Sequence, residues 1–247
     1  LRKGLEAGTG LVGWELVSGQ VDAGLFQAWR FRDLHVRSNG AYPSETDLRL
    51  AQLVVSFEPV WSWFRSDGRV LRSVQVEGVD GLLDFRQGAL PTVEPRELSD
   101  EERQQNAERV MRLLPRNVSF TAPSLAFLAN GQAYRLNEAR GQLSESTTGQ
   151  LSIGEVLIEA DPVFKRLEDL NAVTAWKSGV AYLFDGTLEE GVTLRRLAAD
   201  FVNPEGVSME LNLDGFGGNL RGGIAFMTRE ERLWLDTSLA AFGINLE

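Results

Sequence analysis

Apolar and polar residues alternate along most of this chain, which is the pattern of a β-strand with one buried face. Between residues 28 and 37 the alternation slips by one position at Asp33, and it slips again around Ala51 and Arg196. A β-bulge produces such a slip, and bulges are the usual means of curling a sheet. The pattern therefore predicts roughly twelve to fifteen amphipathic strands in a curled sheet.

One segment has a helical period instead. Between residues 91 and 115 the apolar residues recur at helical spacing, on one face. Ser99 and Glu102 have the spacing of a capping box at the start of this segment, and Pro115 marks its end. The sequence predicts one amphipathic helix, over residues 98–114.

Two shorter segments also depart from alternation. Residues 161–169 have apolar spacing that predicts a short helical excursion. Residues 59–65 open on a proline and carry Trp61, Trp63 and Phe64, which is typical of a short helix or turn. These three aromatic side chains either pack on the end of the sheet or enter a membrane surface as an aromatic belt.

The strands lack the continuous apolar runs of a buried parallel sheet, so we expect them to be antiparallel. One solid helix cannot cover so long an apolar face, and the sheet must bend onto itself or shield something else. The predicted fold is mainly β: a long antiparallel meander curled into a groove, with one inserted amphipathic helix. A closed β-sandwich is the alternative. Residues 1–90 would form an N-terminal β segment with a short helix, 91–115 the helical insertion and 116–247 the C-terminal meander, in one continuous curled sheet.

Composition excludes several classes of function. The 247 residues include 25 Lys and Arg against 35 Asp and Glu, and a net charge of −10 has the wrong sign for binding a phosphate backbone. There is no Cys and a single His, which excludes thiol nucleophiles and multi-histidine metal sites. We therefore expect no nucleic-acid partner, no cofactor and no metal. The lack of Cys also suits an oxidising compartment.

Three places that resemble catalytic or ligand sites are better explained structurally. His35 lies among alternating strand residues and is expected to face solvent rather than to act as a base. Glu189 and Glu190 are adjacent and would point apart, unlike the carboxylate pair of a glycosidase. Asp214 lies in a glycine-rich stretch but lacks the ligand spacing of a calcium loop. We therefore expect that the protein is not an enzyme.

The apolar positions of the last strands are the candidate binding surface. We expect the segments from residue 180 to residue 226 to present one apolar stripe to one side, formed by Tyr182, Phe184, Met209, Leu211, Leu213, Ile224 and Phe226. This stripe either lines a lipid groove or forms the core of an ordinary sandwich.

Both ends of the chain resemble a known family. Residues 10–64 contain GLVGWELVSG, WRFRDLHV and LVVSF followed by a hydrophobic turn, and residues 211–224 read LNLDGFGGNLRGGI. These patterns of glycine and aliphatic residues resemble the AsmA-like proteins of Gram-negative envelopes, which are related to TamB, YhdP and the bridge-like lipid transfer proteins. The resemblance implies a β-groove that binds phospholipid acyl chains, for lipid transport or outer-membrane homeostasis.

The same resemblance implies a location and partners. It places the protein in the periplasm, held to the inner membrane by an N-terminal anchor outside this chain and in contact with other envelope proteins. The chain begins at Leu1 rather than Met, which leaves open a signal peptide or N-terminal anchor ahead of it.

Three classes of function remain open from the sequence. The first is a lipid-handling envelope module, the second a β-rich carbohydrate-binding or adhesion module, and the third an enzyme with an unfamiliar carboxylate site. Exposure separates the first two, because exposed aromatic rings stack on sugars whereas an open apolar trough holds lipid.

Overall fold

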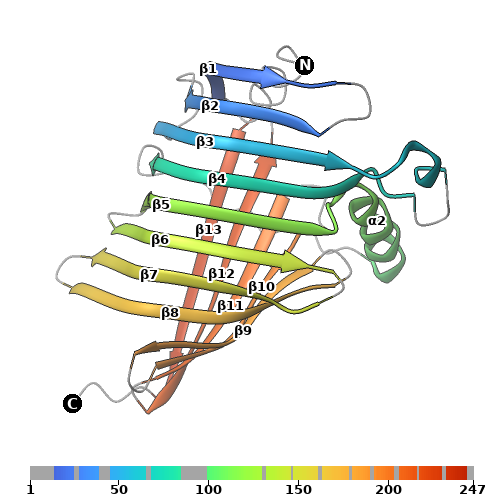
Figure 1. Ribbon diagram of the computed structural model, residues 1–247. Coiled ribbons are helices and arrows are strands. Elements are labelled where there is room, and N and C mark those ends of the chain that lie inside the picture. Colours follow the sequence, from blue (N-terminus) through green and yellow to red (C-terminus); the bar gives the residue numbers. More distant parts are fainter. Residues whose placement is uncertain are drawn as a thin grey trace.

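Over the residues that it describes, the computed structural model is a single sheet of thirteen strands whose spatial order follows their order in the chain (Figure 1). The structure describes residues 14–24, 28–38, 45–64, 68–84, 99–129, 132–145, 147–160, 163–177, 180–189, 192–202, 206–215, 217–229 and 232–243. The predicted mainly-β class is confirmed, and β1 and β13 form the two edges of a sheet that does not close into a barrel.

The strands are β1 (Trp14–Asp22), β2 (Trp29–Ser38), β3 (Glu45–Phe57), β4 (Leu71–Asp84), β5 (Asn117–Ala129), β6 (Gln132–Ser144), β7 (Gly149–Ala160), β8 (Val163–Lys177), β9 (Val180–Glu189), β10 (Val192–Asp200), β11 (Gly206–Gly215), β12 (Gly218–Arg229) and β13 (Arg232–Phe242). The 3₁₀-helix η1 (Val60–Ser62) follows β3, and the α-helix α2 (Asp100–Leu113) lies between β4 and β5.

Helix α2 begins at the predicted capping box. The Oγ of Ser99 accepts a hydrogen bond from the backbone N–H of Glu102 at 3.3 Å, and the Glu102 carboxylate accepts one from the backbone N–H of Ser99 at 3.1 Å. This reciprocal pair satisfies two backbone donors that a helix start otherwise leaves free. The predicted helix is therefore confirmed, apart from Leu98, which lies outside the described residues.

One strand pair corrects the expectation of a purely antiparallel sheet. β4 and β5 are parallel, with Val74 opposite Val118 and Leu83 opposite Phe127. A parallel pair needs a crossover that returns the chain to the end where the first strand began. The segment that contains α2 is this crossover. The other eleven neighbouring pairs are antiparallel.

The predicted helical excursion at residues 161–169 is wrong, because β8 already begins at Val163. Asp169 has a φ of 53°, a left-handed conformation that interrupts the regular alternation of the strand. Leu167 pairs with Val156 and Leu170 with Ile153, so two residues three apart occupy the same face. The interrupted alternation therefore gives the same three-residue apolar spacing in the sequence as a helix does. Residues 161 and 162 lie outside the described residues.

Similar interruptions continue this one across the sheet. Non-glycine residues with left-handed backbone occur on β2, β6, β8 and β9, and a left-handed glycine occurs on β4: Asp33, Glu138, Asp169, Asp185 and Gly78. We call this set of positions the bulge line. On the intervening strands, small residues lie next to the bulge line. Ala51 of β3 contacts the Gly78 position, and Gly154 of β7 lies beside Glu138.

Two of the slips predicted from alternation belong to this bulge line. Asp33 has a φ of 50°, and Ala51 lies opposite it between the pairs Arg32–Gln52 and Leu34–Leu50. The third predicted slip is present on β10, where the register shifts between Leu194 and Arg196. Aligned bulges increase the local twist of every strand they cross, which bends the sheet as a whole.

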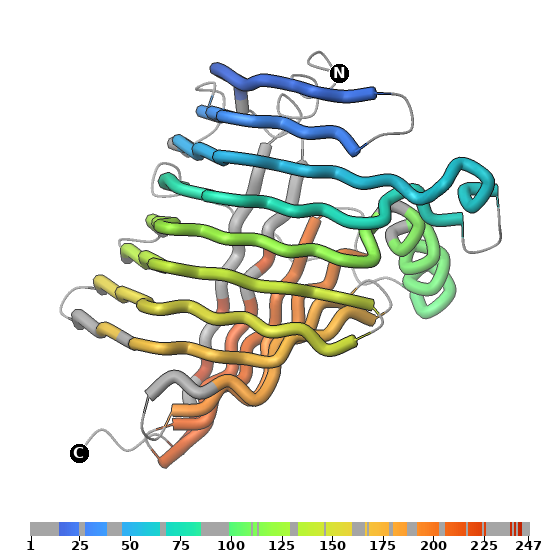
Figure 2. Tube along the Cα trace, viewed as in Figure 1, coloured from blue at the N-terminus to red at the C-terminus, as the bar shows by residue number. Residues whose placement is uncertain are grey.

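The bend carries β9–β13 behind β1–β8, as the ribbon and the tube both show (Figures 1 and 2). One face of the sheet remains apolar from strand to strand. Val55, Val74, Val118 and Leu143 are successive register partners on β3–β6, and Leu183, Leu197 and Leu211 are successive partners on β9–β11. We call this the inner face, because its side chains converge in buried clusters, as they must on the concave side.

Candidate functional site

Most of the predicted apolar stripe lies on the inner face. Met209, Leu211 and Leu213 pair with Ala199, Leu197 and Leu194 of β10, which are inner-face positions. The register of β12 places two further stripe residues on the same face, opposite Met209 and Val207: Ile224 and Phe226. Five of the seven positions are thus brought together on β11 and β12.

The expectation that all seven residues share one face is wrong for Tyr182 and Phe184. They pair with Ala198 and Arg196, which alternate with the inner-face residues of β10. The Arg196 guanidinium carbon lies 5.2 Å from the centroid of the Tyr182 ring, a cation–π contact on the outer face. β9 reads VAYLF at its start, so both of its faces are apolar and alternation does not decide between them. Ala181 and Leu183 take the inner positions instead.

The inner face is only partly covered by the rest of the molecule. Its larger aliphatic side chains on β3–β6 are half-buried rather than buried: Leu48, Leu50, Leu53, Val74, Val76, Val118, Leu136 and Leu143. The most deeply buried hydrophobic side chain among the described residues is Val202, at the end of β10. A closed sandwich of this size would bury many large inner side chains completely.

Other parts of the inner face are buried: among the described residues these include Phe31, Leu34 and Val36 of β2 and two further clusters. The first joins β5–β8 through Ala122, Ala139, Ile153 and Leu170, which lie beside the bulge line. The second contains Trp176, Ala181 and Ala199, and Met111 and Leu114 at the C-terminal end of α2 pack against it. The helix therefore covers the inner face at one end of the strands only. We call this end the helix end.

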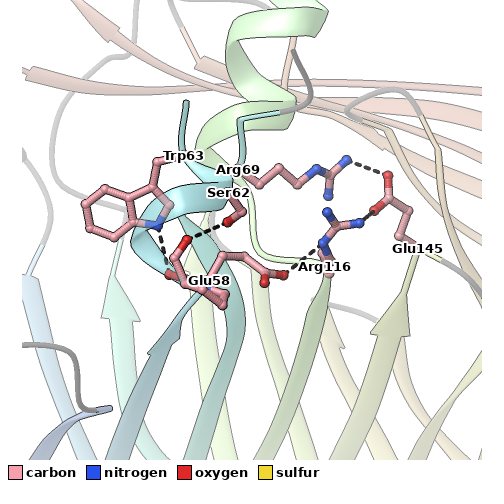
Figure 3. A network of polar contacts seen from close by, with 7 residues as sticks. Glu58, Ser62, Trp63, Arg69, Arg116 and Glu145 are labelled. Atoms are coloured by element: carbon pink, nitrogen blue, oxygen red, sulfur yellow. Dashed lines mark hydrogen bonds and ion pairs between the residues drawn. The ribbon is translucent and has the colours of Figure 1, made fainter. Parts of the chain in front are cut away.

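Polar contacts fix α2 and the neighbouring connections at the helix end. Arg103 of α2 forms an ion pair with Asp200 at the end of β10. Arg69, buried just before β4, forms one with Glu145, which follows β6. Figure 3 shows this part of the molecule, in which Arg116 also reaches Glu145 at 3.6 Å and donates from Nε to Glu58 at 2.9 Å. These bonds tie the end of β3 to the ends of β5 and β6.

Two buried donors lie close to this end without a partner among the described residues. They are the Nη1 of Arg69 and the indole Nε1 of Trp176. Arg69 approaches the sulfur of Met111 at 4.0 Å, and Met111 packs against the cluster that contains Trp176. The helix end of the inner face therefore combines apolar cover with unused hydrogen-bond donors.

His35 is more enclosed than the sequence suggested. Its side chain is 15% exposed, and its Nε2 lies 2.8 Å from the Oδ1 of Asp47 on β3. Burial raises the pKa of Asp47, but the hydrogen bond to His35 and the positive charges of Arg37 and Arg49 outweigh it, and the pKa is lowered from 3.8. The pair links β2 to β3 on the outer face, away from the apolar side chains. Sequence reasoning missed this pairing because Asp47 is remote along the chain.

The carboxylate of Asp214, at the end of β11, accepts hydrogen bonds from side chains of the protein. Asn219 donates from Nδ2 to Asp214 at 2.9 Å, and Arg195 donates from Nε at 2.6 Å. These two hydrogen bonds lower the pKa of Asp214 from 3.8. The carboxylate therefore stabilises the turn between β11 and β12. Within the described residues no group of three or more potential metal ligands comes together. Glu189 ends β9, and Glu190 lies outside the described residues.

Two of the three aromatic residues after β3 do not pack on the end of the sheet. Trp61 is 73% exposed, Trp63 37% and Phe64 85%. They project from η1 and the turn that follows it, confirming the predicted short helix. The packing alternative is therefore wrong for Trp61 and Phe64, whereas Trp63 is covered over most of its surface and its indole donates to the carbonyl of Glu58.

Comparisons with protein-family models, curated proteins and solved structures found no match to this chain. The AsmA-like resemblance stays a prediction. Among the described residues, neither helix has the length and apolar character needed to cross a bilayer.

Proposed function

We propose that the inner face binds the acyl chains of phospholipids. The observation that carries this proposal is an apolar face that runs through the register of the whole sheet and yet stays half-buried over β3–β6. A soluble domain does not normally leave a long contiguous apolar surface to water, and such a surface marks a binding site. Acyl chains are its natural occupant, because they need no hydrogen-bond partners.

The dimensions support the same occupant. The strands β1–β8, which lie on one side of the bend, extend roughly 35 Å along the stacking direction at ~4.8 Å spacing. That is about the thickness of the hydrocarbon core of a bilayer, so more than one acyl chain has room on this face. Each methylene removed from water contributes about 0.8 kcal/mol. A single chain lying on the inner face would therefore be held well.

We further propose that the chain is a periplasmic module of an AsmA-like envelope protein, acting in lipid transport or outer-membrane homeostasis without enzymatic activity. An open, curled, mainly-β sheet supports this proposal, together with the residue patterns at both ends of the chain. Membrane anchoring outside this chain, phospholipid cargo and envelope protein partners belong to the same proposal.

A carbohydrate-binding or adhesion module is the second candidate, favoured by the exposed rings of Trp61 and Phe64. It leaves the half-buried inner face unexplained. The lipid proposal accounts for that face directly.

A pair of charge substitutions on β11 tests the lipid proposal. Leu211→Asp places a carboxylate on the inner face, whereas Asn212→Asp adds the same charge at the next residue, on the outer face. Asn212 accepts a hydrogen bond from Asn219 at 2.6 Å through its Oδ1, an acceptor that aspartate retains. The second variant is therefore a matched control.

The readouts are thermal unfolding and photo-crosslinking to a phospholipid with a diazirine in its acyl chain. On an open face the new carboxylate reaches water when lipid is absent, so Leu211→Asp should stay folded and lose most of the crosslink. Asn212→Asp should crosslink as the wild type does. A wild type that gives no crosslink contradicts the proposal. So does a Leu211→Asp variant destabilised by several kcal/mol, because that is the behaviour of a closed core.

A further inference from the structure

The strongest exposed apolar feature outside the sheet is the turn after β3. Of the five large hydrophobic side chains that are exposed among the described residues, three lie within four residues here: Trp61, Trp63 and Phe64. We call them the aromatic tip. Single exposed hydrophobic residues are ordinary, but three large aromatic side chains clustered on one turn mark an interaction site.

The backbone of the aromatic tip is held in place by its own hydrogen bonds. The N–H of Ser62 donates to the carbonyl of Pro59 at 2.8 Å, and the N–H of Trp63 donates to that of Val60 at 3.2 Å. At the base of the turn, Glu58 accepts from Arg116 at 2.9 Å, which fixes it to the sheet (Figure 3). The aromatic rings are thus displayed by an ordered turn, and binding through them costs little ordering entropy.

Two of the polar side chains in this turn, those of Ser62 and Trp63, are paired within the protein. The indole Nε1 of Trp63 donates to the carbonyl of Glu58 at 2.8 Å, and the hydroxyl of Ser62 donates to the carbonyl of Pro59 at 2.7 Å (Figure 3). A sugar-binding site needs free donors and acceptors beside its aromatic platform to hold the hydroxyl groups. A surface that enters an apolar medium needs the reverse, namely polar groups satisfied within the protein.

We propose that the aromatic tip inserts into the interface of a phospholipid bilayer and docks the helix end of the molecule on the membrane. Tryptophan is the residue that most favours the boundary between headgroups and acyl chains. Three side chains on a narrow turn suit a soft interface better than a protein partner, which needs about 800 Å² of matched surface on each side. With a net charge of −10 the protein gains nothing from anionic lipid, so the apolar contact drives binding.

This inference is independent of lipid binding on the inner face. The aromatic tip and Leu211 belong to different elements, and the two proposals therefore fail separately. If the tip docks the protein, Leu211→Asp should bind vesicles like the wild type. If vesicle binding depends on lipid held by the inner face, Leu211→Asp should lose it and a tip variant should keep it.

Flotation of the full chain with phosphatidylcholine vesicles is the test. We compare the wild type with the double variant Trp61→Ser/Phe64→Ser and with the control Val17→Ser/Phe242→Ser, which also removes two exposed apolar side chains, from β1 and β13. Because all four side chains are exposed, both variants should keep the circular dichroism spectrum and melting temperature of the wild type. The proposal predicts at least about tenfold weaker vesicle binding for the tip variant, an unchanged control, and no loss of wild-type binding in about 0.5 M salt.

Three results would overturn the proposal. One is a wild type that does not float with these vesicles. Another is a tip variant that floats as well as the wild type does. The third is binding that requires phosphatidylglycerol and disappears in salt, which would assign the contact to charge. If vesicle binding is absent and the tip variant instead loses retention on an immobilised glycan or a protein partner, the aromatic tip belongs to that class of ligand.

Discussion

At the scale of single residues, the curvature of the sheet depends on a few backbone conformations. Among the described residues, four non-glycine positions have left-handed backbone, and three of them are aspartates: Asp33, Asp169 and Asp185. Aspartate tolerates this conformation better than most residues, because its short side chain bonds to nearby backbone groups. Glu138 on β6, with a φ of 55°, lacks that advantage. It is the most sensitive of the four positions.

Replacing Glu138 by valine should destabilise the protein by about 1–2 kcal/mol, because a β-branched side chain is strained in the left-handed region. Arg140→Val is the control. Arg140 is exposed on the same strand with ordinary backbone, where valine suits a strand and should change the stability by less than about 0.5 kcal/mol. Urea unfolding measures both. If the two substitutions change the free energy of unfolding equally, the left-handed backbone at Glu138 does not disfavour a β-branched residue, and this prediction is wrong.

Some of these positions were visible in the sequence. The slip at Asp33 could be recognised because Phe31 and Leu34 flank it on a strand whose other face is polar. The sequence pattern predicts the wrong face for Tyr182 and Phe184, because β9 carries apolar residues on both faces. Where alternation is absent, only the register with β10 decides which residues turn inward.

At the scale of elements, α2 is the part that the sequence defines best. Its capping box, its apolar spacing and the proline that follows it are all local signals, so they can be recognised in the sequence without knowledge of the tertiary structure. In the folded molecule its last turn packs on the cluster around Trp176. Its N-terminal half forms the ion pair with Asp200. The helix thus joins the connection between β4 and β5 to β10.

Substituting Ser99 by alanine should lower the free energy of unfolding by about 1 kcal/mol, because the backbone N–H of Glu102 loses its acceptor. Gln104→Ala serves as the control, since Gln104 is exposed within the helix and alanine is a slightly better helix former. Chemical denaturation compares the two variants. If Ser99→Ala is as stable as Gln104→Ala, the capping box contributes nothing to the folded state.

The parallel pairing of β4 with β5 cannot be predicted from the sequence pattern. Val74 and Val76 of β4 alternate with polar residues in the same way whichever direction the next strand runs. The orientation follows from where the crossover returns, and the helix in this crossover packs through Met111 and Leu114 on residues of β8–β10 that are remote in the sequence. A long-range contact of this kind produces no periodic pattern in the local sequence from which it could be predicted.

At the scale of the whole molecule, the sheet is one continuous surface with two unequal faces. The outer face carries polar pairs, such as His35 with Asp47 and the ion pair of Arg195 with Asp214. The inner face carries aliphatic side chains that are left half-buried over β3–β6. α2 covers the inner face near one end of the strands. A curled, open sheet of this kind supports the proposal of an apolar ligand along its length.

Native mass spectrometry of gently purified protein tests most directly whether the inner face holds acyl chains. After incubation with phospholipid vesicles and removal of free lipid, the wild type should carry adducts with the mass of one or more phospholipids, and these should dissociate as intact lipid on collisional activation. Asn212→Asp should carry the same adducts and Leu211→Asp should lack them. A wild type that appears only as the bare chain, while it keeps its native charge-state distribution, would contradict lipid binding on the inner face.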